Sequence, residues 1–146
     1  MNNNTTEFDK EKRPKLGVGV MILNEFDEVL CSQRIAPGTL HHMVWQFPGG
    51  FQEYGESWEY TSKREVKEEC DADLDIEKIK FLAVMNVLYL KANYHNVGIF
   101  TFSSVKKDTF TFKNLEPEKC TDWRWVAWKD FLELRPHFIP FKYFFE

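Results

Sequence analysis

The sequence contains few cysteines, and no two of them are close together. Cys31, Cys70 and Cys120 form no Cys-x-x-Cys pair, so neither a disulfide framework nor a zinc site is expected. Unpaired, scattered cysteines are typical of proteins from a reducing compartment. We therefore expect a cytoplasmic protein.

Long hydrophobic runs are also missing. The longest apolar stretch, residues 81–90, is interrupted by Asn86 and is too short to span a bilayer. Residues 1–14 are polar and have no apolar centre, unlike a secretory signal peptide. These absences predict that the protein has no membrane partner.

The chain has no excess of positive charge. Its 19 Lys and Arg residues against 23 Asp and Glu residues give a formal net charge of −4, whereas proteins that coat nucleic acids are normally basic. We therefore expect no nucleic-acid polymer as a partner. An acidic protein can still bind a small molecule rich in phosphate if metal ions reverse the local charge.

Aromatic residues are abundant, with 14 Phe, 5 Trp and 5 Tyr among 146 residues. A chain of this length forms one domain with a sizeable core, and aromatic side chains are good core fillers. Residues 1–13 are rich in Asn, Thr and charge, which is typical of a flexible tail. The sequence has no repeat or linker, so residues 14–146 are predicted to form a single domain.

Hydrophobic patterning predicts strands before and after one central helix. The expected strands are residues 16–23, 29–34, 45–47, 76–90, 94–105, 109–112 and 120–128. The central helix is expected to begin after Ser57, a good N-cap residue, and to run to about Cys70. Shorter helices are expected at 128–133 and 141–145. This order favours an α/β fold, in which helices cover the faces of a mixed sheet.

The central helix stacks carboxylates on one face. Because a helix turns by about 100° per residue, Glu65, Glu68 and Glu69 lie on the same side of it. Like charges at these spacings destabilise a helix, which suggests that a cation lies between them. Oxygen ligands favour Mg²⁺ or Mn²⁺ over Zn²⁺. The alternative is a solvated helix face with salt bridges.

The segment around these carboxylates resembles the Nudix box. Gly50, Glu56, the run Arg64-Glu65-Val66 and the pair Glu68-Glu69 match its pattern, whereas Asp71 and Ala72 replace its last glycine and last aliphatic residue. Aspartate tolerates the left-handed backbone that this glycine adopts better than most residues do. The resemblance implies the Nudix fold, an α/β/α sandwich with a central mixed β-sheet. It also implies Mg²⁺-dependent hydrolysis of a nucleoside diphosphate linked to another group, with Mn²⁺ as an alternative ion.

The same resemblance implies roles for individual residues. Glu65 and Glu69 are expected to bind metal, together with the Gly50 carbonyl. Glu68 is expected to be either a third ligand or the general base. Arg64 is expected to pair with Glu56 or with a helix carboxylate and to orient the catalytic group, although an ordinary surface arginine is the alternative.

A second resemblance lies outside the box. The runs at 45–50, 93–100, 114–120 and 123–128 are similar to those of small MutT-like nucleoside triphosphate diphosphatases. This branch implies cleavage of dGTP, 8-oxo-dGTP or related dNTPs to a monophosphate and pyrophosphate, by a homodimer. The substrate-binding residues it implies are Arg34, Phe47, Gly49, Gly50, Glu116 and Phe138.

Other interpretations of these features stay open. Arg34 and Glu116 are explained equally well as ordinary surface charges, and Phe138 as a core residue of this aromatic chain. The substrate could instead be a dinucleoside polyphosphate, a prenyl diphosphate or a nucleotide sugar. A Nudix-fold nucleotide-binding module without turnover is a further alternative, although such modules commonly lose box glutamates that this chain keeps.

Overall fold

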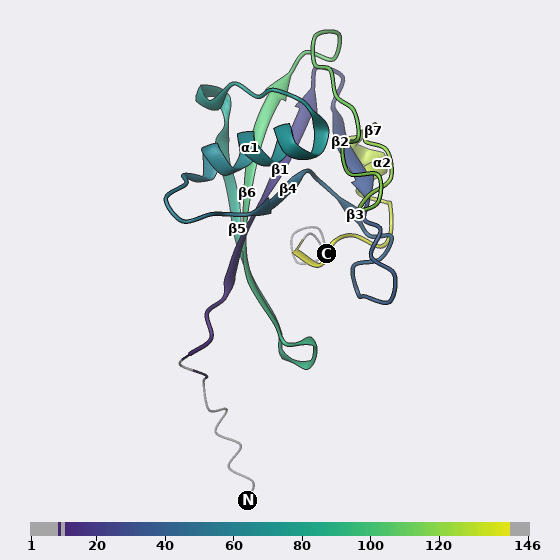
Figure 1. Ribbon diagram of the computed structural model, residues 1–146. Helices are drawn as coiled ribbons and strands as arrows, with labels where there is room; N and C mark the ends of the chain where they lie inside the picture. The colour runs from purple at the N-terminus through teal and green to yellow at the C-terminus, as the bar shows by residue number, and fades with distance from the viewer. Residues whose placement is uncertain (1–8, 10, 141–146) are drawn as a thin grey trace, which may run out of the picture.

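The computed structural model describes residue 9 and residues 11–140, which form a mixed sheet flanked by helices (Figure 1). The strands are β1 (Lys15–Asn24), β2 (Glu28–Gln33), β3 (Trp45–Gln46), β4 (Gly49–Phe51), β5 (Lys80–Tyr89), β6 (Tyr94–Val105) and β7 (Arg124–Ala127). The α-helices are α1 (Trp58–Cys70) and α2 (Trp128–Phe131), and the 3₁₀ helices are η1 (Ile76–Lys78) and η2 (Leu90–Ala92). No helix in the described ranges is long and apolar enough to cross a membrane.

A parallel pair lies at the centre of the sheet. Strands β1 and β6 run in the same direction from the pair Lys15↔Asn96 to the pair Asn24↔Val105. The other strand pairs are antiparallel, in the order β3-β2-β1-β6-β5, with β4 on β1 and β7 on β2. The beginning of β1 pairs with β4 and its end pairs with β2. The predicted mixed sheet is therefore confirmed.

Alternate residues of β1 contribute to two different cores. Val20 packs in a cluster that contains Val66 of α1, whereas Met21 packs in a cluster that contains Phe131 of α2. Successive side chains of a strand point to opposite faces of a sheet. Helices α1 and α2 thus cover opposite faces, which confirms the predicted sandwich (Figure 1).

Local sequence explains where α1 begins and ends. The Ser57 side chain accepts a hydrogen bond from the Tyr60 amide at 3.1 Å, as expected of an N-cap. Val66 and Cys70 are buried on the inner face. Asp71 ends the helix in the left-handed conformation, with φ 47°, and its amide donates to the Lys67 carbonyl. The predictions for this helix are confirmed.

Three strand predictions are wrong, two in their boundaries and one in its existence. The strand expected from residue 76 begins at Lys80, because the Asp75 side chain caps η1 instead. No strand forms over 109–112. The Phe110 amide donates a hydrogen bond to the Lys106 carbonyl, which forms a turn, and the Phe110 ring packs in the core. The strand expected over 120–128 is limited to β7.

The C-terminal expectations fare differently. The helix expected over 128–133 ends at Phe131. The expected helix over 141–145 lies outside the described residues, as does most of the expected tail, residues 1–8 and 10.

Candidate active site

A close approach between β4 and α1 forms the centre of the site. An added side-chain carbon on Gly50 would lie 2.5 Å from the carboxylate atoms of Glu65. Any residue larger than glycine would therefore displace that carboxylate or the strand. Gly50 lets the strand backbone and the helix carboxylate meet.

Arg64 organises the acidic groups around this contact. Its Nε and Nη2 donate to the two carboxylate oxygens of Glu56 at 2.6 and 2.9 Å, a bidentate pair. Its Nη1 donates to Glu65 at 2.7 Å and to Glu68 at 3.2 Å, and its Nη2 also donates to the Phe51 carbonyl. Arg64 therefore links the loop before α1 to two carboxylates of the helix, as the sequence predicts.

Glu56 is the best-compensated carboxylate. Its side chain is only 9 % exposed, and it also accepts from the Thr61 hydroxyl at 2.8 Å and the Glu53 amide at 3.0 Å. The hydrogen bonds from Arg64, above all, lower the pKa of Glu56 to about 2. This group stays ionised and holds Arg64 in place.

Glu69 is in the opposite situation. It is largely buried, and among the described residues its one hydrogen-bond donor is the Gly49 amide at 3.0 Å. Burial raises the pKa of Glu69 to about 8, with help from the negative charges of Glu65 and Glu116 and against the lowering effect of the Gly49 hydrogen bond and of Arg34. Burial also raises the pKa of Glu65, whose side chain is 12 % exposed. Two carboxylates that lack enough positive charge therefore lie beside Gly50.

These residues suit a hard divalent cation. Glu65 and Glu69 supply oxygen atoms only, next to a strand backbone whose carbonyl oxygens have the same ligand chemistry. A cation there would stabilise the ionised carboxylates against the burial and the mutual repulsion that raise both pKa values. Glu68 lies further out, with a side chain 56 % exposed and bound to Arg64. In this arrangement no three described His, Cys, Asp or Glu side chains converge as a ready-made metal group.

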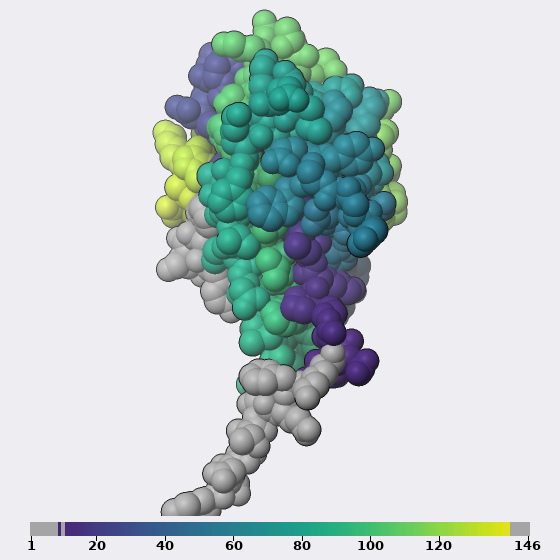
Figure 2. Space-filling view, turned by 90° about the vertical axis from the view of Figure 1, so that its left-hand side faces the viewer, coloured from purple at the N-terminus to yellow at the C-terminus, as the bar shows by residue number. Residues whose placement is uncertain are grey.

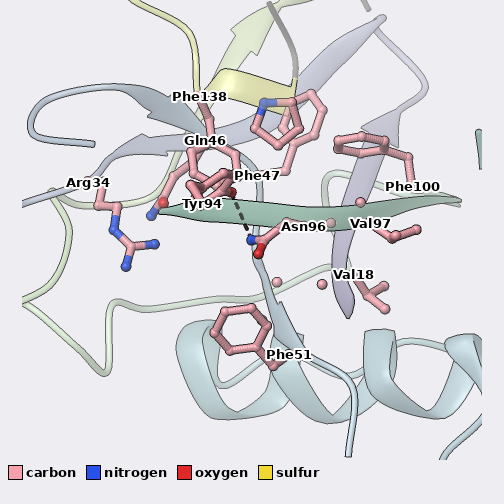
Figure 3. Close-up of a pocket in the computed structure, with 16 residues that line it drawn as sticks. Val18, Arg34, Gln46, Phe47, Phe51, Tyr94, Asn96, Val97, Phe100 and Phe138 are labelled. Atoms are coloured by element: carbon pink, nitrogen blue, oxygen red, sulfur yellow. Dashed lines mark hydrogen bonds between the residues drawn. The ribbon is translucent and has the colours of Figure 1, made fainter. Parts of the chain in front are cut away.

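A pocket is lined by residues of β1, β4 and β6, among them Gly49 and Gly50 next to these carboxylates (Figure 3). Five of the six residues predicted to bind substrate line it: Arg34, Phe47, Gly49, Gly50 and Phe138. Glu116 does not line it, but its charge acts on Glu65 and Glu69. The structure thus brings the predicted substrate residues together beside the predicted metal ligands.

Several pocket residues were not predicted. Asn96 and Tyr94, both on β6, line the pocket, and Asn96 donates from its amide to the Tyr94 hydroxyl at 2.8 Å (Figure 3). His41 contacts the rings of Tyr94 and Phe138, with centroids 5.5 and 5.2 Å apart. Phe51 lines the opposite side. The run 93–100 pointed to this strand but not to these individual side chains.

The comparisons with known proteins agree with this geometry. A family model described as the NUDIX domain matches residues 13–145. Nudix hydrolase 2 of Arabidopsis thaliana is 25% identical over 81% of the chain and 41% of its own length. Nudix hydrolase 5 of the same plant is 28% identical over 71% of the chain and 33% of its own length. The chain thus spans less than half the length of these two relatives.

Solved structures share the fold. The MutT NUDIX hydrolase from Burkholderia pseudomallei has a TM-score of 0.73 and 21% identity, over 87% of this chain and 92% of that one. The NUDIX domain of NrtR from Shewanella oneidensis, complexed with ADP ribose, has a TM-score of 0.71 and 20% identity, over 93% and 88%. With the family model covering nearly the whole chain and the box residues assembled around Gly50, the protein belongs to the NUDIX domain family.

Proposed function

We propose that this protein hydrolyses a nucleoside triphosphate to the monophosphate and pyrophosphate, with Mg²⁺ or Mn²⁺ bound. The expected substrates are dGTP, 8-oxo-dGTP or related dNTPs. The observation that carries this proposal is the pair of partly buried carboxylates, Glu65 against Gly50 and Glu69 on the Gly49 amide, next to an aromatic-lined pocket.

The chain's own residues supply binding and orientation. Glu65, Glu69 and the Gly50 carbonyl would hold the divalent ion, which when bound offsets phosphate charge and lowers the pKa of water. Arg34, at the pocket wall, suits a phosphate oxygen, since a guanidinium donates two parallel hydrogen bonds. Glu68, the more exposed carboxylate, remains available as the third ligand or as the general base that accepts a proton from water.

The aromatic pocket suits the nucleobase. Phe47 and Phe138 line it together with Tyr94, and a flat base stacked on such rings gains about 1–3 kcal/mol by analogy with single-strand binders. Asn96 adds a polar amide within the same pocket. Apolar walls with a few convergent polar groups are typical of small-molecule sites.

A nucleoside diphosphate linked to a sugar is a second candidate substrate. The NrtR domain was solved with ADP ribose. A bifunctional NMN adenylyltransferase/ADP ribose pyrophosphatase from Francisella tularensis, solved with AMP and a manganese ion, also shares the fold with a TM-score of 0.68. The chemistry at the metal would be the same, and only the group beyond the diphosphate would differ.

A substrate panel tests the proposal. The purified protein is assayed with the four dNTPs, 8-oxo-dGTP, ADP-ribose, a dinucleoside polyphosphate and a prenyl diphosphate, with Mg²⁺ or with EDTA. We expect Mg²⁺-dependent pyrophosphate release from dNTPs, fastest with a guanine base. Faster cleavage of ADP-ribose would favour the second candidate. Thermal stabilisation by nucleotide and metal with no product from any compound would overturn hydrolysis in favour of a binding module.

Two properties of the whole protein complete the proposal. We infer a cytoplasmic location, which suits three free and buried cysteines. We also infer a homodimer, as the MutT-like resemblance implies. Sedimentation velocity of the purified protein tests the second inference directly.

A further inference from the structure

Strand β5 lies at an edge of the sheet. It is paired with β6 on one side and with no other strand among the described residues. Figure 2 looks onto this side of the molecule, and β5 runs down its face as a teal band beside α1. An edge strand presents unpaired amide and carbonyl groups, which form a template for another strand.

The composition of this edge is unusual. No charged residue occurs from Phe81 to Leu90, although native edge strands usually carry charges that prevent pairing. Six large apolar residues here are exposed: Phe81 by 52 %, Leu82 by 40 %, Val84 by 53 %, Leu88 by 48 %, Tyr89 by 41 % and Leu90 by 64 %. The one register shift is at Phe81/Ala83, so the rest of the strand is regular.

Helix α1 extends the apolar edge instead of covering it. Trp58, in the first turn of α1, is 36 % exposed, and its ring centroid is 5.6 Å from that of Phe81. Together with the six exposed residues of 81–90, Trp58 leaves on the order of 600 Å² of apolar side-chain surface in water, given about 150–250 Å² for a whole large side chain. A specific interface needs about 500 Å² or more from each partner. The edge is therefore large enough for a stable contact.

A second copy of this chain fits the edge. A two-fold axis through the middle of β5 would pair the strand antiparallel with itself, so each uncharged stretch would face the same stretch of its partner. Lys80 of one copy and Lys91 of the other would then approach each other at both ends of the interface, where solvent and salt screen their repulsion. Because residues 81–90 carry no charge, this edge does not need a partner with charges opposite to its own.

We propose that β5 of one copy pairs antiparallel with β5 of another, joining two sheets into one continuous sheet across a two-fold axis. The proposal rests on the inferred homodimer and not on the proposed hydrolysis. It assigns the interface to residues 80–90 and to Trp58, away from the carboxylates of α1.

Sedimentation velocity of the full chain and of the double variant Val84→Lys/Leu88→Lys tests this interface. Both side chains are exposed, so the substitutions leave the core intact. We expect a wild-type dimer and a variant whose dissociation constant is roughly a hundredfold higher, because like charges would face each other across the axis. Phe26→Lys, a change at a residue 65 % exposed in the turn between β1 and β2, is the matched control and should stay dimeric.

Hydrogen exchange gives a second measurement on the unmodified protein. The amides of residues 80–89 that point away from β6 should gain protection as the protein concentration rises, while the turn around Phe26 should not change. A monomeric wild-type protein at about 100 μM, a folded double variant that dimerises like wild type, or β5 amides whose exchange is independent of concentration would each overturn the proposal. Should the double variant fail to fold, the exchange measurement alone decides. Pyrophosphate release is measured separately, so loss of the dimer and absence of hydrolysis are distinguishable.

Discussion

Glu56 and Glu69 differ in how much positive charge each one meets. Glu56 receives two hydrogen bonds from Arg64 and has a lowered pKa, whereas Glu69 receives one backbone amide and has a raised pKa. Arg64 supplies the positive charge that balances Glu56, so this carboxylate needs no bound cation. The second arrangement disfavours the ionised form of Glu69, which a bound cation would stabilise, and perturbed groups of this kind are typical of functional sites.

Replacing Glu69 by glutamine tests its proposed role as a metal ligand. Glu69→Gln keeps the size of the side chain, so we expect an intact fold and a loss of turnover of about a hundredfold or more, the range seen for key catalytic groups. Mg²⁺-dependent pyrophosphate release and circular dichroism measure the two properties. Glu59→Gln in the first turn of α1 has the same change of charge and should keep near-normal activity. Near-normal activity of Glu69→Gln would contradict the assignment.

The ion pair between Glu56 and Arg64 predicts how stability depends on pH. The pKa of Glu56 is lowered from 4.5 to about 2 in the folded state, so its contribution is fully present above about pH 4.5 and is lost as the pH falls toward 2. Denaturant unfolding without metal, from pH 6 to pH 2.5, should therefore show a steeper loss of stability for wild type than for Glu56→Gln. Parallel curves would mean that the pair contributes nothing to the folded state.

At the level of elements, β4 and α1 depend on glycine for their close approach. Gly50→Ala places a carbon against the Glu65 carboxylate. Because the Glu65 carboxylate ends a flexible side chain and can move aside, we expect a loss of only about 1 kcal/mol in the free energy of unfolding, together with strongly reduced turnover. Chemical denaturation and the pyrophosphate assay measure these effects. Gly38→Ala is the control, because an added carbon there meets no atom within 4 Å. Since Gly38 has φ +78°, a small stability loss with normal activity is expected from it.

The end of α1 carries a residue that departs from the Nudix pattern. Asp71 adopts φ 47° and forms ion pairs with Lys67 and Lys113 at 3.0 and 3.2 Å. A left-handed backbone costs most residues about 1–2 kcal/mol, whereas exposed ion pairs contribute about 0–1 kcal/mol and weaken with salt. Asp71→Gly should therefore raise the free energy of unfolding by about 1 kcal/mol in 1 M salt and by less in dilute buffer. Urea unfolding at both salt concentrations would show it, and destabilisation in high salt would contradict the backbone argument.

At the level of the whole molecule, local signals were predictable and distant contacts were not. The sequence predicts α1 from Ser57 to Cys70 because its cap, its apolar spacing and its terminus all lie within the segment. The resemblance to the Nudix box, not local patterning, implies that Arg64 pairs with Glu56 or with a helix carboxylate, and in the structure it bonds to both. The strand expected at 109–112 does not form, because Phe110 lies in a turn and still packs its ring in the core. Local hydrophobic patterning does not distinguish a buried turn residue from a strand residue.

The pocket shows the same limit. Arg34, Phe47 and Phe138 were predicted from resemblance to a family, not from patterning. Tyr94 and Asn96 reach the pocket because β6 pairs in parallel with β1, which lies about 80 residues earlier in the chain. No short-range feature of the sequence specifies that register, so these two residues could be assigned only from the structure.

The central claim is that Glu65 and Glu69 hold a divalent cation beside the pocket. Anomalous diffraction from crystals soaked in Mn²⁺ tests it most directly, because the metal identifies its own position. We predict a strong anomalous peak bound by carboxylate oxygens of Glu65 and Glu69, at coordination distance from the Gly50 carbonyl. Fully soaked crystals in which these two carboxylates point apart with no peak between them would contradict the account.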